Sequence, residues 1–138
     1  MKKTTRNIAM LCALGLVAAA GSGALRAQQT APAVKRNVLL KQDMATAPGK
    51  EAVMALVEIP VGGAEGRHTH PAEVFAFVLD GTLSLEAEGK PTTTLKAGDY
   101  FTIMPGQIHN GVNAGAVPVK LSVVFVAEKG KPLTTPVP

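Results

Sequence analysis

Turn-forming residues recur at short intervals along most of this chain and limit what it can fold into. Glycine or proline marks each of a series of short segments: Pro48-Gly49, Gly62-Gly63, Asp80-Gly81, Gly89-Lys90-Pro91, Gly98-Asp99 and Pro105-Gly106. The stretches between these turn signals are long enough for strands, but they leave almost no room for a helix. We therefore expect an all-β fold.

Nine segments between the turn signals are predicted to form strands. In segment 83–88, leucine and alanine alternate with serine and glutamate, which is typical of a strand with one buried face. Many short strands without a repeat of fixed period favour a sandwich or barrel over a propeller or solenoid. The predicted strands are 34–40, 51–59, 66–70, 74–79, 83–88, 92–95, 100–104, 109–112 and 119–127.

The first 27 residues have the features of a secretory signal peptide. A basic start with Lys2, Lys3 and Arg6 precedes an uncharged apolar run over 8–20, and small residues lead to Ala27. The run is too short and too rich in glycine for a retained transmembrane helix, which needs roughly 20 apolar residues. We therefore expect cleavage after Ala27, a periplasmic or secreted mature protein, and no membrane attachment once the signal is removed.

The mature chain is predicted to be one domain with a short extension at each end. The whole chain has 138 residues, and two domains of half that length would each lack a self-sufficient core. Segments 28–33 and 129–138 are polar or contain several prolines, so we expect an extended or disordered arm and tail. The folded domain should then span residues 34–128.

Removal of the signal peptide would leave a chain with balanced charge and no thiol. Four of the fourteen Lys and Arg residues and the single cysteine, Cys12, lie in the first 27 residues, which leaves ten basic against ten acidic side chains. Such a chain has no basic block to hold a phosphate backbone, so nucleic acid is not an expected partner. Without cysteine, no thiolate can serve as a metal ligand or nucleophile.

All three histidines of the chain lie in two short segments. His68 and His70 are separated by one residue, and His109 follows the turn at Pro105-Gly106. On a strand, residues i and i+2 point to the same face about 7 Å apart, so the first two imidazoles can converge on one ion. These residues alone leave open an exposed polar strand edge for the pair and a simple turn residue for His109. The metal interpretation requires that the fold bring both segments together.

Two segments resemble the sequence motifs of the cupin family. The segment from Gly62 to Gly81 contains the His-x-His pair and resembles the first motif, and the segment from Gly98 to His109, followed by Asn113, resembles the second. The resemblance covers about residues 52–126, most of the predicted mature chain. It implies a single-domain jelly-roll β-barrel in which the two motifs lie on adjacent strands.

The resemblance also implies one divalent metal bound inside the barrel by His68, His70 and His109, together with an acid of the first motif. Neutral imidazoles without thiolates suit Mn, Fe, Co, Ni, Cu or Zn, and the affinity order alone does not select among these ions. Because ligand histidines must be neutral, we expect metal to be lost as the pH falls through about 6.

The acid of the first motif is displaced by one position in this chain. The family position of the glutamate corresponds to Val74, whereas this chain has Glu73. Because alternate strand residues face opposite sides, Glu73 should point away from the histidines unless Pro71 introduces a bulge or kink that turns it inward. Glu73 is therefore either a fourth ligand or a solvated carboxylate beside a site of three histidines.

Small inward-facing side chains near the histidines are expected to leave room for a small-molecule ligand or substrate. The side chains expected to line this pocket are Val74, Ala76, Met54 and Met104, with ordinary barrel core as the alternative. Gln107 is close enough in sequence to His109 to be expected as a partner that supports this ligand from outside the metal's own shell.

The opposite face of the same strand carries an apolar row of Phe75, Phe77 and Leu79. Such a row must be covered, either by the chain's own N-terminal strand or by a second subunit. Cupins commonly pair through a face of this kind, so the resemblance implies a homodimer.

The sequence is compatible with two functions of different kinds. The first is a metal-dependent enzyme, such as a dioxygenase, isomerase or decarboxylase, acting on a small oxygen-rich molecule. Beyond Glu73 and Tyr100, however, the sequence places no titratable group that could move protons in the pocket. The alternative is an exported protein that binds a small molecule or metal ion without turnover. An empty barrel gives no reason for every histidine to occupy a metal-motif position.

Overall fold

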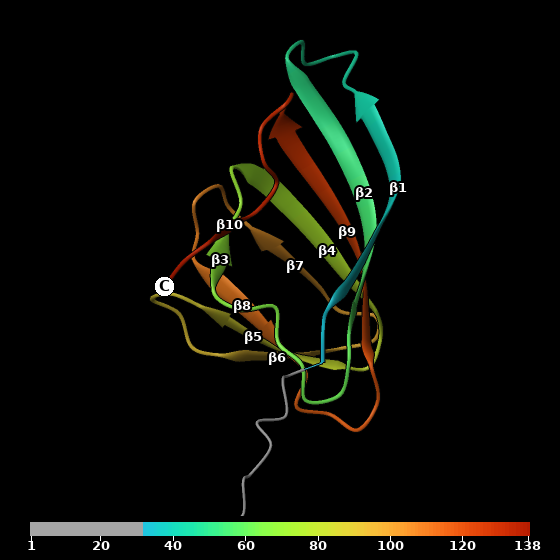
Figure 1. The fold of residues 1–138 in the computed structure, drawn as a ribbon, viewed down its shortest axis with the longest axis vertical. Helices are drawn as coiled ribbons and strands as arrows, with labels where there is room; N and C mark the ends of the chain where they lie inside the picture. Colours follow the sequence, from blue (N-terminus) through green and yellow to red (C-terminus); the bar gives the residue numbers. More distant parts are fainter. Residues whose placement is uncertain (1–31) are drawn as a thin grey trace, which may run out of the picture.

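The computed structural model describes residues 32–138, which form two five-stranded antiparallel sheets that face each other (Figure 1). The first sheet contains, in order, β1 (Lys35–Asp43), β2 (Lys50–Ile59), β9 (Val119–Glu128), β4 (Ala72–Asp80) and β7 (Tyr100–Ile103). The second sheet contains β10 (Thr135–Pro136), β3 (His68–Thr69), β8 (His109–Val112), β5 (Thr82–Ala87) and β6 (Thr93–Lys96). This confirms the predicted all-β jelly roll.

The predicted signal peptide and residues 28–31 of the predicted arm lie outside the described part of the chain. Within residues 32–138, no helix has the length and apolar character needed to cross a membrane.

The core of the barrel follows from the alternation of buried and exposed residues along the long strands. On β2, β4 and β9, every second side chain is buried, and these side chains join Leu83 of β5 and Ile103 of β7 in one apolar cluster. The cluster is made almost entirely of aliphatic side chains, with Phe125 as its aromatic member. Burial of each such side chain stabilises the fold by about 1.5–3 kcal/mol, so the core lies between the two sheets.

Two residues at the ends of the resembling motifs connect strands that are distant in sequence. Gly81 has a φ of 80°, and a Cβ there would lie 2.7 Å from the carbonyl oxygen of Pro118, so the turn after β4 requires glycine. Asn113 is fully buried, and its side-chain amide donates to the carbonyl oxygens of Ile59 and Val117 at 2.9 Å each. These contacts fix the turns at the end of the barrel opposite the chain's C-terminal strand.

The C-terminal tail forms a strand that the sequence did not indicate. Thr135 and Pro136 of β10 pair with Thr69 and His68 of β3, and the amide of Val137 donates to the carbonyl of Arg67 at 3.0 Å. Pro136 is tolerated because β10 is an edge strand, where a missing N–H breaks no interior ladder. The tail is extended, and it lies against the strand that carries the first two histidines (Figure 1).

Candidate metal centre

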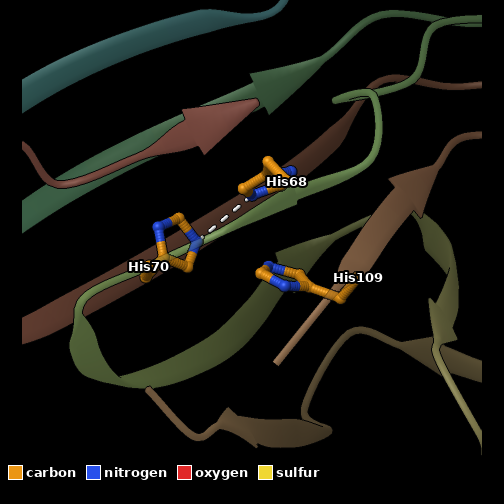
Figure 2. A group of neighbouring side chains, drawn as sticks. All are labelled: His68, His70 and His109. Carbon is orange, nitrogen blue, oxygen red and sulfur yellow. Dashed lines mark hydrogen bonds between the residues drawn. The ribbon is translucent and has the colours of Figure 1, made fainter. Parts of the chain in front are cut away.

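The three histidines converge at one place inside the barrel. His68 and His109 are cross-strand partners on β3 and β8, and His70 directly follows β3. Each side chain is only 4–5% exposed, and one ring nitrogen from each lies within 4.8 Å of the other two. Figure 2 shows the three rings turned toward one another from two neighbouring strands. The fold thus brings together the two segments that the sequence left separate.

Backbone carbonyl oxygens hold all three rings in the same protonation form. Because a carbonyl oxygen only accepts hydrogen bonds, each Nδ1 carries the proton and donates it. Each Nε2 then keeps a free lone pair, which is the arrangement found in metal-binding histidines. The Nδ1 atoms of His68, His70 and His109 lie 2.7, 2.6 and 3.0 Å from the carbonyl oxygens of Gly66, Leu133 and Gln107, respectively.

The distance between two of these Nε2 atoms fits a metal site. The Nε2 atoms of His68 and His70 are 3.2 Å apart, as the dashed line in Figure 2 marks. With both protons on Nδ1, two lone pairs face each other at this distance, and a cation between them would remove their repulsion. Two nitrogens bound at about 2.1 Å to one metal at ordinary coordination angles lie roughly 3.0–3.4 Å apart. The cluster could therefore hold a divalent metal ion without rearrangement of these two rings.

Burial keeps the imidazoles neutral. Burial lowers the pKa of His70 to about 4, against a weaker opposing effect of its hydrogen bond to Leu133. Burial also lowers the pKa of His109, again partly opposed by the hydrogen bond to a backbone carbonyl, that of Gln107. Neutral imidazoles are the form that binds a metal, so both rings stay competent at a lower pH than free histidine.

The lowered pKa values predict acid sensitivity of the metal-free protein. The unfolded chain binds a proton at each histidine near pH 6.5, whereas folded His70 binds one only near pH 4. Stability should therefore be complete above pH 6.5 and fall steadily between pH 6.5 and 4. Thermal melts of metal-free protein across this range measure the effect. A His70→Gln variant should show a flatter profile, and a profile of the parent that is already flat would contradict the prediction.

A cavity of about 120 Å³ opens inside the barrel beside the histidines. His70, His109 and Val74 line it together with apolar side chains of the first sheet, including Val53 and Phe125. The cavity has mostly apolar walls and a polar end where the imidazoles lie, which is the usual character of a site for a small molecule.

Two charged side chains that the sequence did not suggest also line this cavity. Glu65 has a side chain only 13% exposed, and its Oε1 lies 3.2 Å from a guanidinium nitrogen of Arg36. Burial raises the pKa of the Glu65 carboxyl, although the nearby charges of His68 and Arg36 oppose this effect. Glu65 is thus the titratable acid near the histidines for which the sequence offered no candidate.

Glycine at position 111 makes room for the Glu65 carboxylate. A Cβ on Gly111 would lie 2.7 Å from Glu65 Oε2, and the backbone amide of Glu65 donates to the carbonyl of Gly111 at 2.9 Å. Gly111 and His109 are both buried residues of β8, two positions apart, so they share the inner face of the strand. A glycine two residues after a predicted ligand histidine was the one available sequence signal for an additional group at this site.

The structure places Glu73 away from the histidines. Glu73 is an exposed residue of β4 between buried Ala72 and Val74, and the pairing of β4 with β9 runs without a bulge from Ala72 to Val78. Pro71 therefore does not turn the carboxylate inward. Of the two alternatives for Glu73, the geometry corresponds to the solvated carboxylate.

The other residues singled out in the sequence take varied positions. Val74 lines the cavity, and Ala76 is buried in the core on the same face. The two methionines do not line the pocket, because Met54 has the strand parity opposite to buried Val53, while Met104 is 59% exposed at the end of β7. Gln107 does contact His109, but through its backbone carbonyl rather than its side chain. Tyr100 is 74% exposed and far from a pocket-facing role.

Solved structures with this fold come from proteins of several kinds. The chain is 28% identical to a conserved protein with a double-stranded β-helix domain from Klebsiella pneumoniae, with a TM-score of 0.56 over 70% of this chain and 85% of that protein. It is 22% identical to the polyketide cyclase RemF from Streptomyces resistomycificus, with a TM-score of 0.60 over 75% and 70% of the two chains.

A third similar structure is an oxalate oxidase. The identity is 25% and the TM-score 0.58 over 74% of this chain, which spans 55% of the oxidase. No curated protein matches the chain. A family model described as a cupin domain matches residues 55–126, which is more than half of the chain. Together with the two facing sheets and the cluster of three histidines from both motifs, this match shows that the chain is a member of the cupin family.

Proposed function

We propose that this protein is a metal-dependent enzyme that acts on a small oxygen-rich molecule. The observation that carries the proposal is the orientation of the three imidazoles. All three have Nδ1 bound to a backbone carbonyl, which leaves each Nε2 as a free ligand atom in the cluster beside the cavity. Such convergence of buried, neutral side chains would be costly to maintain in an empty apolar core.

The proposed metal site consists of one divalent transition metal bound by His68, His70 and His109, without Glu73. Three imidazoles suit Mn, Fe, Co, Ni, Cu or Zn. When bound, such an ion supplies Lewis-acid polarisation of an oxygen atom on a substrate. Three protein ligands also leave coordination positions open for water or substrate, as in catalytic rather than structural metal sites.

Glu65 favours an enzyme over a protein that only binds its ligand. An enzyme of this kind needs a group that accepts or donates a proton, and the buried carboxyl of Glu65 lines the same cavity as His70 and His109. The raised pKa of Glu65 brings the carboxyl closer to the pH at which proton transfer is most effective. The oxalate oxidase with a similar fold acts, by its name, on a small oxygen-rich anion, which supports a substrate of this size.

Metal analysis followed by a substrate screen tests the proposal. Protein reconstituted with Mn, Fe, Co, Ni, Cu and Zn is expected to retain one equivalent of at least one of these ions. The loaded protein is then incubated with small carboxylic acids, hydroxy acids and enolisable ketones, with and without O₂, and products are identified. Failure to retain any of the ions would overturn the proposal. Stoichiometric metal with ligand binding but no product would instead favour a non-catalytic exported binding protein.

We also propose that the protein is exported by its N-terminal segment and works in the periplasm or outside the cell. The basic start and the apolar run of the first 27 residues support this proposal. Cell fractionation, with mass spectrometry of the mature N-terminus, tests it, and Gln28 is the expected first residue.

We further propose that two copies of the chain pair through the outer face of the first sheet. Phe75, Phe77 and Leu79 of β4 are 48%, 45% and 47% exposed. β1 pairs with β2 at the edge of this sheet, and no other part of residues 32–138 covers the row. A second copy is a natural cover for such an apolar surface.

Replacement of both Phe75 and Phe77 by lysine is therefore expected to convert a dimer to a monomer. Lysines on the shared face would meet lysines of the other copy and lose the apolar contact. Light scattering coupled to gel filtration measures the mass. The exposed Val61, in the turn after β2, provides a control, because Val61→Lys should leave the mass unchanged. A parent protein that is already monomeric at micromolar concentration would contradict the proposal.

A further inference from the structure

Arg36 extends from the edge strand of the first sheet into the barrel cavity. Arg36 pairs with Val57 across β1 and β2, and Val57 is a buried residue of the inner face. Cross-strand partners project to the same side of a sheet, so Arg36 also projects inward. Its side chain lines the cavity that His70 and His109 line, and it remains 47% exposed at the mouth. A cation therefore lies at the mouth, at the opposite end of the side-chain lining from the solvent-free core.

Arg36 and Glu65 are the only side chains with a formal charge that line this cavity among the described residues, if the histidines are neutral. Their single short contact joins one guanidinium nitrogen to Glu65 Oε1 at 3.2 Å. Glu65 is held from the other side, because its amide binds the carbonyl of Gly111 and its Oε2 lies against the same glycine. The carboxylate is thus fixed, whereas the arginine side chain is half exposed.

The contact with Glu65 leaves most of the guanidinium free for another anion. Arginine has five N–H donors in a planar fork, and the described contact with Glu65 uses one nitrogen. A half-exposed ion pair of this kind is also weak. The fork matches the geometry of a second carboxylate, which it can bind through two parallel hydrogen bonds.

We propose that Arg36 binds the carboxylate of a short-chain carboxylic acid in the barrel cavity and thereby determines which substrates the site accepts. The inference deepens the proposed function, on which it rests for the assumption that ligand and metal share this cavity. The remaining walls are apolar, with Val38, Val53 and Val123 among them, and they suit the hydrocarbon part of such an acid.

The size of the cavity limits the acid. An apolar cavity of about 150 Å³ holds a benzene molecule, and this cavity measures about 120 Å³. The ligand should therefore have about six non-hydrogen atoms or fewer within the cavity, which corresponds to a carboxylic acid of three to four carbons or so.

Propionate and its neutral isostere propionamide test the role of Arg36. Calorimetric titration gives the affinity of each compound for the parent and for three variants, both metal-loaded and metal-free, with the metal content of every sample measured. Arg36→Met removes the charge and keeps the length of the side chain. Lys35→Met is the matched control, because Lys35 also lies on β1 and makes an ion pair, with Glu58 at 3.0 Å. Glu65→Gln removes the competing anion and keeps its shape.

The variants should change propionate binding in opposite directions. Arg36→Met is expected to weaken propionate binding about tenfold or more, Glu65→Gln to strengthen it severalfold, and Lys35→Met to leave it unchanged. Propionamide should bind weakly and equally to all four proteins. A purely structural ion pair would instead make Arg36→Met and Glu65→Gln alike in effect.

Three outcomes would overturn the proposal: equal propionate affinity of the parent and Arg36→Met, propionamide binding as tight as propionate binding, or no propionate binding to the parent. The metal-free samples keep this test separate from the test of the proposed function. A chain that retains no metal would remove the proposed enzyme, while the dependence of propionate binding on Arg36 would still be measured.

Discussion

Replacement of His109 by alanine is expected to abolish stoichiometric metal binding, which is the largest effect of any single substitution in this protein. His109 is the only ligand from the second motif, and its ring closes the cluster that His68 and His70 begin on the neighbouring strand. Two imidazoles of one short segment would remain. They bind a divalent ion far more weakly than three converging, preoriented ligands, because the lost bond is not replaced inside a buried site.

Elemental analysis after reconstitution and desalting measures this effect, and thermal melting gives a second readout. A ligand that binds only the folded state at 100 times its Kd stabilises that state by about 2.7 kcal/mol. The parent should therefore gain stability when the metal is added, and His109→Ala should gain none.

The neighbouring Asn110 provides a matched control for this substitution. Asn110 follows His109 on β8, but its side chain binds Glu86 at 3.0 Å instead of facing the cluster. Asn110→Ala should keep the full metal content of the parent. Equal metal content in His109→Ala and the parent would contradict the proposed ligand set, and the search for ligands would then turn to the carboxylates.

The positions of the strands could be read from the sequence because turn signals are local. A glycine such as Gly81, which needs a positive φ at a close approach to Pro118, marks a chain reversal within a few residues. Alternation within each segment then fixes which side chains face inward. The same alternation places Met54 outside the pocket, since Val53 and Ala55 on either side of it are buried. For Met104 no such pattern exists, because it lies beyond the end of β7.

The ligand histidines could be located in the sequence, but the groups around them could not. His70 is held by Leu133, 63 positions later, and Glu65 by Arg36, 29 positions earlier. Contacts over such separations depend on how the sheets fold onto each other, and neither periodicity nor turn chemistry carries that information. The sequence therefore predicted a site with metal ligands and no acid, whereas the folded chain supplies an acid and a cation from the loop before β3 and from the edge strand.

Ending the chain after Lys131 is expected to weaken metal binding about 10–100-fold. The removed segment includes Leu133, whose carbonyl oxygen lies 2.6 Å from His70 Nδ1, and Thr134, whose hydroxyl lies 3.4 Å from the same nitrogen. Without these partners the ring of His70 can rotate and can carry its proton on Nε2, which blocks the lone pair that binds the metal. Competition with a chelator of known affinity measures the change.

Two further variants show whether the carbonyl or the bulk of the tail matters. Removal of Val137 and Pro138 alone breaks the backbone bond to Arg67 at 3.0 Å but keeps Leu133 in place. Leu133→Ala keeps the carbonyl and removes the side chain that lines the cavity. Both should bind metal within a fewfold of the parent if the carbonyl orients the ring. If Leu133→Ala weakens binding as much as the truncation does, exclusion of water by the side chain, rather than orientation of His70, is the tail's contribution to the site.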